Sequence, residues 1–270
     1  MGTLDEQALD RALRDDPGAA LDMLADMTVT ADERLRAASR RLAARIILDR
    51  ANTGRARHRG ISRLRAVPAD RGGDLDVDRS LDSIAQAHRA GRPPGLDELL
   101  ARDWGRPQLA VCLLVDASGS MSGARLAAAA LTAAACTWRA PAEFAVFTFA
   151  RHVRPLRPLT GEVGAAALVE RLLSLRGHGV TALATALRRA GEELASARAS
   201  RRITVLLSDC RATDGEDPIP AATGLEELFV LAPADDCAGA AEFAARAGAR
   251  FEPLADAADA PAALGRLLDG

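Results

Sequence analysis

The second half of the chain alternates short apolar runs with longer segments of helical spacing. An uncharged run from Leu109 to Val115 ends at Asp116, and an alanine-rich segment with helical spacing extends from Gly123 to about Arg139. A continuous apolar run that stops at a turn is typical of a strand buried on both faces. The pattern therefore predicts a buried strand, a tight turn and a helix.

The same alternation continues to the end of the chain. Further strands are predicted at 143–150, 152–159, 203–210, 227–232 and 250–252. Helices are predicted at 162–174, from the glycine-rich turn near 177 to about 198, at 237–247 and over a last segment ending near 268. The prolines of the 152–159 segment favour a sheet edge. Strands alternating with helices predict an α/β fold with a doubly wound, mostly parallel sheet flanked by helices.

The first half of the chain has a different organisation. Helical periodicity covers residues 4–51, including a capping-box pair of Thr30 and Glu33. This helical extension must pack either on the later domain or on a partner. We therefore divide the chain into a helical N-terminal region (1–54), a basic and acidic linker region (55–106) and the α/β domain (107–270).

The charge of the linker region changes from basic to acidic along its length. Five arginines fall between Arg55 and Arg65, in a strip that is either a docking site for acidic protein or nucleic acid or a solvated linker. Acidic residues follow from Asp74, but an EF-hand loop is excluded because Arg79 and Ala85 stand where glycine and glutamate are required. We predict a helix at about 76–90 with Val77, Leu81 and Ile84 on one face, and a short edge strand in 96–108 before the central strand.

Composition narrows the possible functions. The 270 residues have a net charge of −2, 49% hydrophobic content and no lysine, which excludes a self-contained P-loop ATPase or Schiff-base enzyme. The four cysteines form no CxxC pair and are expected to be reduced and mostly buried, and Trp104 and Trp138 are expected to be packing residues. The polar N-terminus and the lack of an apolar run of roughly 20 residues favour a cytoplasmic protein without a membrane span.

Polar residues gather where three predicted strands or turns end. Asp116, Ser118 and Ser120 alternate after the first buried strand, Thr181 lies in the glycine-rich turn, and Asp209 follows the strand that begins at residue 203. In an open α/β sheet the carboxyl ends of the strands form the ligand site. Two carboxylates and three hydroxyls meeting there suit Mg²⁺, although Ser120 or Ser122 as a simple helix cap is the alternative.

These five residues resemble the metal-ion-dependent adhesion site of von Willebrand factor A (VWA) domains. The resemblance implies that Asp116, Ser118, Ser120, Thr181 and Asp209 bind Mg²⁺, with Mn²⁺ as an alternative ion, directly or through water, and that one coordination position is left for a partner's carboxylate. The order of the RGISRLR strip, the DLDVDRSLDSIA segment, the ARDW strand and the DASGSM turn is similar to magnesium-chelatase D subunits and to A-domain proteins encoded beside MoxR-type AAA+ ATPases. An ATPase-like half is missing, and Ala182-Leu183 replaces a frequent Pro-Leu pair.

The resemblance implies a non-enzymatic adaptor that joins an AAA+ ATPase to a client protein offering Asp or Glu. The client reaction would be metal insertion, cofactor maturation or protein remodelling. One alternative is a Mg²⁺-dependent phosphoryl-transfer or hydrolytic enzyme using the same oxygens. Another, less favoured, is nucleic-acid binding through the arginine strip.

Other candidate residues give weaker signals. His178 either lines the rim of the metal face or is an exposed loop residue, and His58, His88 and His152 have no zinc-site spacing. The acids at 214, 216 and 217 form either a rim that modulates partner choice or a solvated loop. No G-x-S-x-G motif surrounds the serines.

Overall fold

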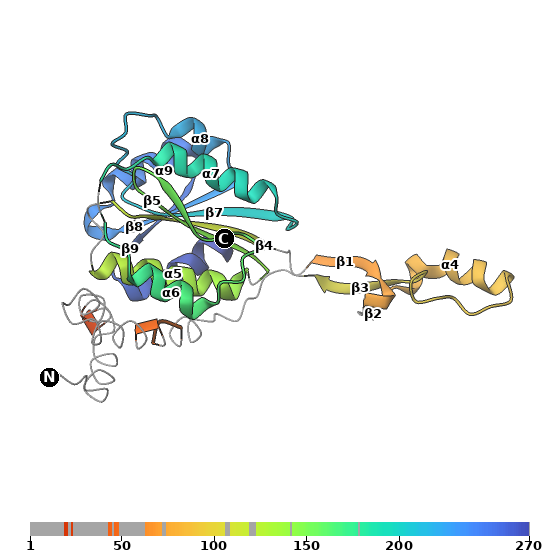
Figure 1. The fold of residues 1–270 in the computed structure, drawn as a ribbon. Helices are drawn as coiled ribbons and strands as arrows, with labels where there is room; N and C mark the ends of the chain where they lie inside the picture. The colour runs from red at the N-terminus through yellow and green to blue at the C-terminus, as the bar shows by residue number, and fades with distance from the viewer. Residues whose placement is uncertain are drawn as a thin grey trace. The chain divides into compact units, whose positions relative to one another are not determined.

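The chain folds into two compact units, residues 1–58 with 109–270 and residues Arg59–Gln108. A computed structural model describes residues 19–20, 23, 43–44, 46–48, 63–71, 74–105, 109–118, 123–140, 142–177 and 179–269. Element labels follow Figure 1.

The larger unit is built on a six-stranded sheet with the order β6-β5-β4-β7-β8-β9. All neighbouring pairs are parallel except β5 and β6, and β6 lies at the edge that its prolines favour. The strands are β4 (Leu109–Asp116), β5 (Glu143–Phe149), β6 (Val153–Arg157), β7 (Arg201–Leu207), β8 (Glu227–Pro233) and β9 (Arg250–Leu254). This arrangement confirms the predicted mostly parallel α/β sheet.

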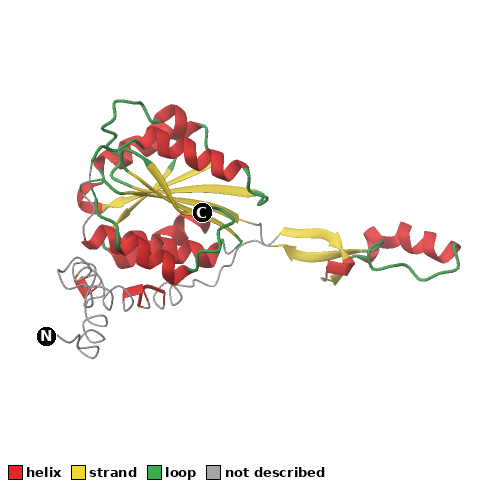
Figure 2. Cartoon of the chain, in the orientation of Figure 1, coloured by secondary structure: helices red, strands yellow, loops and turns green. Residues whose placement is uncertain are grey.

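Helices cover both faces of this sheet (Figures 1 and 2). One hydrophobic cluster joins the sheet to α5 (Gly123–Arg139), α6 (Ala165–Leu173) and α10 (Ala260–Asp269). The other joins it to α7 (Leu183–Ala195), α8 (Ile219–Thr223) and α9 (Ala238–Ala247). Two 3-10 turns, η2 (Ala234–Asp236) and η3 (Ala257–Asp259), precede α9 and α10. The helices at 123–139, 237–247 and near the end of the chain therefore form where the spacing predicts them.

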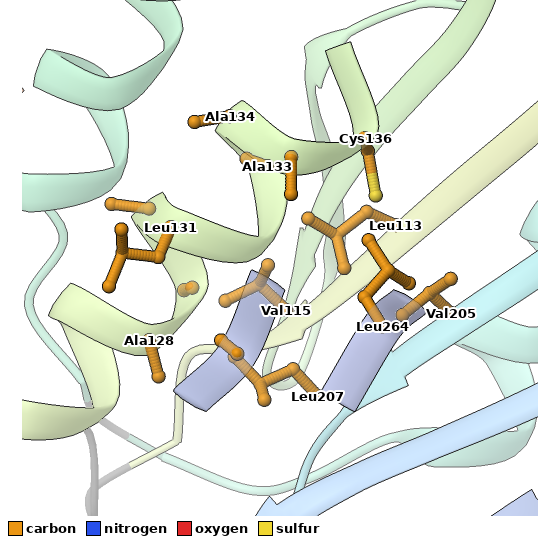
Figure 3. Packing of buried hydrophobic residues seen from close by; sticks show 14 of the residues in the cluster. Leu113, Val115, Ala128, Leu131, Ala133, Ala134, Cys136, Val205, Leu207 and Leu264 are labelled. Atoms are coloured by element: carbon orange, nitrogen blue, oxygen red, sulfur yellow. The ribbon is translucent and has the colours of Figure 1, made fainter. Parts of the chain in front are cut away.

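Strand β4 is central because both of its faces are apolar. Leu113 and Val115 belong to the cluster under α5, whereas Cys112 and Leu114 belong to the cluster under α7. Figure 3 shows the first interface, where small alanines allow α5 to lie close to the sheet; the labelled residues there are Ala128, Leu131, Ala133, Ala134, Cys136, Val205, Leu207 and Leu264. Each buried leucine in such a layer contributes about 1.5–3 kcal/mol to folding.

Part of the N-terminal region belongs to this same core. Residues 43–44 and 46–48 are helical, and Ala43, Ala44 and Ile47 are buried in the cluster under α5. Of the two surfaces considered for the helical extension, these described residues use the α/β domain.

The smaller unit is a three-stranded antiparallel sheet, order β1-β3-β2, with helix α4. Its elements are β1 (Arg63–Pro68), η1 (Ala69–Arg71), β2 (Asp74–Leu75), α4 (Val77–Arg89) and β3 (Leu100–Gly105). Asp76 caps α4 by accepting a hydrogen bond from the Arg79 N–H (3.3 Å). Ser80 ties the helix to β3, because its hydroxyl donates to the Leu100 carbonyl (3.2 Å) and accepts from the Leu100 N–H (2.9 Å).

Three expectations are corrected here. The strand predicted in 96–108 does form, but as the middle strand of the small sheet and not as an edge of the main one. The last residues of the arginine strip, 63–65, form the start of β1 and are not a linker, because β3 supplies a pairing partner that local sequence cannot reveal; residues 55–62 of the strip lie outside the described residues. Trp138 is 44% exposed, so it is not an interior packing residue; the side chain of Trp104 lies outside the described residues.

Candidate functional site at the carboxyl edge of the sheet

Asp116 is the buried carboxylate of the candidate site. It ends β4 with only 4% of its surface exposed. One carboxylate oxygen, Oδ1, accepts from the Ser118 backbone N–H at 2.9 Å, and Oδ2 accepts from the Ser208 hydroxyl at 2.6 Å. The Ala117 N–H also donates to the Phe149 carbonyl at 2.7 Å, which fixes the loop to the end of β5. The carboxylate is therefore held in one orientation by neutral donors.

Burial dominates the electrostatics of this carboxylate. Loss of hydration raises the pKa of Asp116, and the negative charge of Asp209 raises it further. Hydrogen bonds from Ser208 and Ser118 lower the pKa but do not offset the burial. The two acids therefore lie within electrostatic reach of each other, with an unfavourable concentration of negative charge.

Thr181 is held against two other loops through its backbone. Its N–H donates to the Thr213 hydroxyl at 2.8 Å, and its carbonyl accepts from the Thr213 N–H at 3.1 Å. The next residue, Ala182, donates to the Ala150 carbonyl at 2.9 Å. Thr181 is 4% exposed, and its hydroxyl takes no part in these bonds. The turn before α7 is thus pinned to the loops that follow β5 and β7.

The loop after β7 carries Asp209 and an unusual backbone conformation. Asp209 Oδ1 accepts from the Arg211 N–H at 3.1 Å, and Oδ2 lies 3.9 Å from Arg125 Nη1. Cys210 has a φ of 59°, in the left-handed region that favours glycine. The Cys210 N–H donates to the Ser208 hydroxyl at 2.9 Å. Ser208 therefore couples the backbone of this loop to the carboxylate of Asp116.

Four of the five predicted ligand residues lie on described loops at the carboxyl edge: Asp116, Ser118, Thr181 and Asp209. Ser118 is 7% exposed, so three of the four are nearly buried. Ser120 and His178 lie outside the described residues. The assignment of these residues as metal ligands remains a prediction. It rests on the kind of oxygen atoms that their side chains carry.

Three residues at the site were not singled out from the sequence. Ser208 and Thr213 support predicted ligand residues, and Arg125 lies beside Asp209. A polar residue that ends an apolar strand directly before Asp209 is a usable signal for Ser208. Thr213 and Arg125 carry no such signal, since their positions depend on how separate loops and a helix meet.

Other metal and nucleophile chemistry has little basis in the described part of the chain. No group of three or more His, Cys, Asp or Glu that could hold a metal occurs among the described residues. The four cysteines are free, and three are buried, as expected. Burial raises the pKa of the Cys136 thiol to about 12 and that of Cys210 above its usual range, so neither is an activated thiolate.

The acids that follow Asp209 are exposed and partly paired. Glu216 forms a two-bond ion pair with Arg188, with distances of 2.6 and 2.9 Å. The pair lowers the pKa of Glu216, mainly through the Arg188 hydrogen bonds. Asp214 accepts a hydrogen bond from the Glu216 N–H at 3.3 Å.

The described helices include none that is long and apolar enough to cross a bilayer.

The sheet and its polar loops define an α/β domain with a candidate binding site at the carboxyl ends of its strands. The same fold occurs in an aerotolerance-related membrane protein from Bacteroides fragilis carrying multiple mutations to serine (TM-score 0.50, 16% identity, 60% of this chain and 98% of that one). It also occurs in the conserved hypothetical protein BatB from Bacteroides thetaiotaomicron (TM-score 0.50, 15% identity, 59% and 97%). At these identities the likeness concerns the fold alone.

The family is given by the sequence. Residues 25–234 match the model of the VWA domain containing CoxE-like proteins, and the chain belongs to that family. No protein of curated function matches the chain significantly.

Proposed function

We propose that this protein is a non-enzymatic VWA interaction module that binds Mg²⁺ at the carboxyl edge of its sheet and uses it to capture a partner's carboxylate. The proposed ligands are Asp116, Ser118, Ser120, Thr181 and Asp209, with Mn²⁺ as a possible substitute. The observation that carries the proposal is the proximity of the buried Asp116 to Asp209, at the ends of the neighbouring parallel strands β4 and β7.

The chemistry of the donor set fits such an ion. Carboxylate and hydroxyl oxygens are hard ligands, which Mg²⁺ and Mn²⁺ prefer. Asp116 is buried, and the neutral groups of Ser118 and Ser208 donate hydrogen bonds to its carboxylate. A buried carboxylate beside a second acid is costly unless a cation offsets the charge. When bound, the ion supplies that charge and an open coordination position for an Asp or Glu of the partner.

The chain's own residues keep the ligands in place. Ser208 and the Ser118 N–H orient the two oxygens of Asp116, while Thr213 fixes the turn that carries Thr181. Such supporting hydrogen bonds around ligand residues reduce the motion that must be lost when a metal binds. These hydrogen bonds hold and orient the ligand residues, which is what a binding site requires.

Membership of the CoxE-like family supports a more specific role. We propose that the partner is an AAA+ ATPase of the MoxR or chelatase type, and that the module links the ATPase to a client in metal insertion, cofactor maturation or protein remodelling. The chain itself lacks lysine, so it has no P-loop of its own, and ATP hydrolysis would have to come from the partner. The proposed site of action is the cytoplasm.

The test is a pull-down from the native cell extract in Mg²⁺ and in EDTA. Wild type, Asp116→Ala and Glu242→Ala are compared, the last being an exposed acid on α9 that serves as a matched control. An AAA+ ATPase or client retained by wild type and by Glu242→Ala in Mg²⁺, but lost in EDTA and with Asp116→Ala, is the expected result. Partners that persist in every sample would overturn the proposal.

The same proteins test the enzymatic alternative. Hydrolysis of a generic phosphoester by wild type that disappears in Asp116→Ala would replace the adaptor role with metal-dependent catalysis. We expect no turnover above background in any of the three proteins.

A further inference from the structure

Arg125 lies between two carboxylates at the edge of the candidate metal site. It belongs to the first turn of α5, and its side chain is 23% exposed. Arg125 Nη1 lies 3.9 Å from Asp209 Oδ2, and Nη2 lies 3.4 Å from Asp236 Oδ2. Asp209 is a proposed metal ligand, whereas Asp236 lies in η2, after β8, and was assigned no role by sequence.

Three ion pairs and one backbone hydrogen bond close a ring of four residues. Arg211 contacts the other oxygen of Asp236, and its own N–H donates to Asp209 Oδ1 at 3.1 Å. Three separate elements therefore meet through alternating charges: the start of α5, the loop after β7 and the turn after β8. Asp209 and Asp236 are 11% and 25% exposed, so solvent screens these contacts only in part.

The two distances from Arg125 differ in a way that matters. The contact with Asp236 is the shorter and is within hydrogen-bond range, while that with Asp209 is at the outer limit of an ion pair. An arginine cannot lose its charge in a protein, so the guanidinium remains a permanent cation near Asp209. It offsets the charge of the metal-free site and repels any dication that binds there.

We propose that Arg125 is a built-in counter-cation of the metal site, and that Asp236 is the positioning residue that holds it back from Asp209. This inference rests on the proposed metal-binding function. Together the pair sets the cation affinity: Arg125 lowers it by competing for Asp209, and Asp236 raises it by keeping the guanidinium at the longer distance. A partner or a modification acting on Asp236 would change metal affinity without touching a ligand.

The proposal makes opposite predictions for the two residues. Arg125→Gln should tighten Mg²⁺ binding on the order of tenfold, since a single charge and a dication several Å apart in a solvated site repel by about that factor. Asp236→Asn should weaken binding several-fold, because the guanidinium then pairs fully with Asp209. In the Arg125→Gln background, Asp236→Asn should weaken binding by a smaller factor than in wild type, because only the direct charge of Asp236 is then lost and not its hold on Arg125.

Isothermal titration of full-length protein with Mg²⁺ alone measures these affinities. Wild type, the two single variants, the double variant and Arg266→Gln are compared; Arg266 pairs with Glu252 in an exposed contact and serves as the control. Circular dichroism and thermal unfolding verify that each variant is folded. The readout is metal affinity, so no partner or activity is needed.

The outcomes separate two failures. If wild type binds Mg²⁺ but Arg125→Gln leaves the affinity unchanged or weakens it, the counter-cation inference is overturned and the metal site stands. The same holds if Asp236→Asn weakens binding equally in the presence and absence of Arg125. If none of the five proteins binds Mg²⁺, the metal site and this inference are both wrong.

Discussion

Replacing Asp116 by asparagine should stabilise the metal-free protein. The substitution keeps the shape of a side chain that is 4% exposed but removes its charge. Burial and the nearby Asp209 raise the pKa of Asp116 in the folded state above its ordinary value of 3.8. For an acid with a raised pKa, folding stability falls as pH rises through the unfolded and then the folded pKa, and stays lower above both. At neutral pH the wild type therefore has a penalty that Asp116→Asn lacks.

The size of the effect follows from the hydrogen bonds that remain. The asparagine carbonyl oxygen can still accept from the Ser118 N–H, and its amide can donate to the Ser208 hydroxyl, which must then turn its own proton elsewhere. Removing a buried, uncompensated charge raises the free energy of unfolding by a few kcal/mol, and the disturbed Ser208 hydrogen bond lowers it by about 1 kcal/mol. We expect a net gain of about 1–2 kcal/mol, or about 2–6 °C in melting temperature for a chain of this size.

Mg²⁺ should reverse the order of stability, so that wild type becomes more stable than Asp116→Asn. A ligand present at 100 times its dissociation constant stabilises a folded protein by about 2.7 kcal/mol, and this applies to wild type but not to Asp116→Asn. The assay is urea and thermal unfolding at neutral pH in EDTA and in Mg²⁺, with Glu242→Gln as an exposed control expected to stay within about 0.5 kcal/mol of wild type. The reasoning is refuted if the variant is less stable than wild type in EDTA. Equal stabilisation of both proteins by Mg²⁺ would mean that the ion binds elsewhere.

Three further predictions concern single features of the fold. The buried hydroxyl of Thr204 has no hydrogen-bond partner among the described residues, so Thr204→Val should raise the free energy of unfolding by about 1 kcal/mol in urea titrations, and a loss would contradict this. Because Cys210 has a φ of 59°, Cys210→Gly should be more stable than Cys210→Ala by about 1 kcal/mol in thermal unfolding; equal stabilities would remove the strain argument. Hydrogen bonds from Arg92 hold the pKa of Glu98 at about 2. The contribution of ionised Glu98 to folding stability is therefore present above the ordinary pKa and lost as pH falls toward 2. In Arg92→Gln the pKa of Glu98, followed by NMR, should rise toward 4.5; an unchanged value would show that the Gly95 N–H alone lowers it.

Local sequence was sufficient for the architecture of the larger unit. Helices cover both faces of β4 because every position from Ala110 to Val115 is hydrophobic. The prolines of β6 keep that strand at an edge of the sheet. The carboxyl-edge placement of Asp116 and Asp209 also follows from sequence, since both come just after parallel strands, which end on the same side. These features depend on periodicity, which neighbouring residues alone encode.

Tertiary structure decided which strands pair and how the site is supported. The sequence contains the strand 100–105, but only the tertiary structure shows that it pairs with 63–68 and not with the main sheet, because pairing joins residues far apart in the chain. The support of Asp116 by Ser208 spans 92 positions, and the Arg125–Asp236 contact spans 111. Such contacts depend on the meeting of separate loops and on the rotation of α5, which no local pattern specifies. The sequence thus determined the elements and the residue types at their ends, and the fold determined which charges and hydrogen bonds surround those residues.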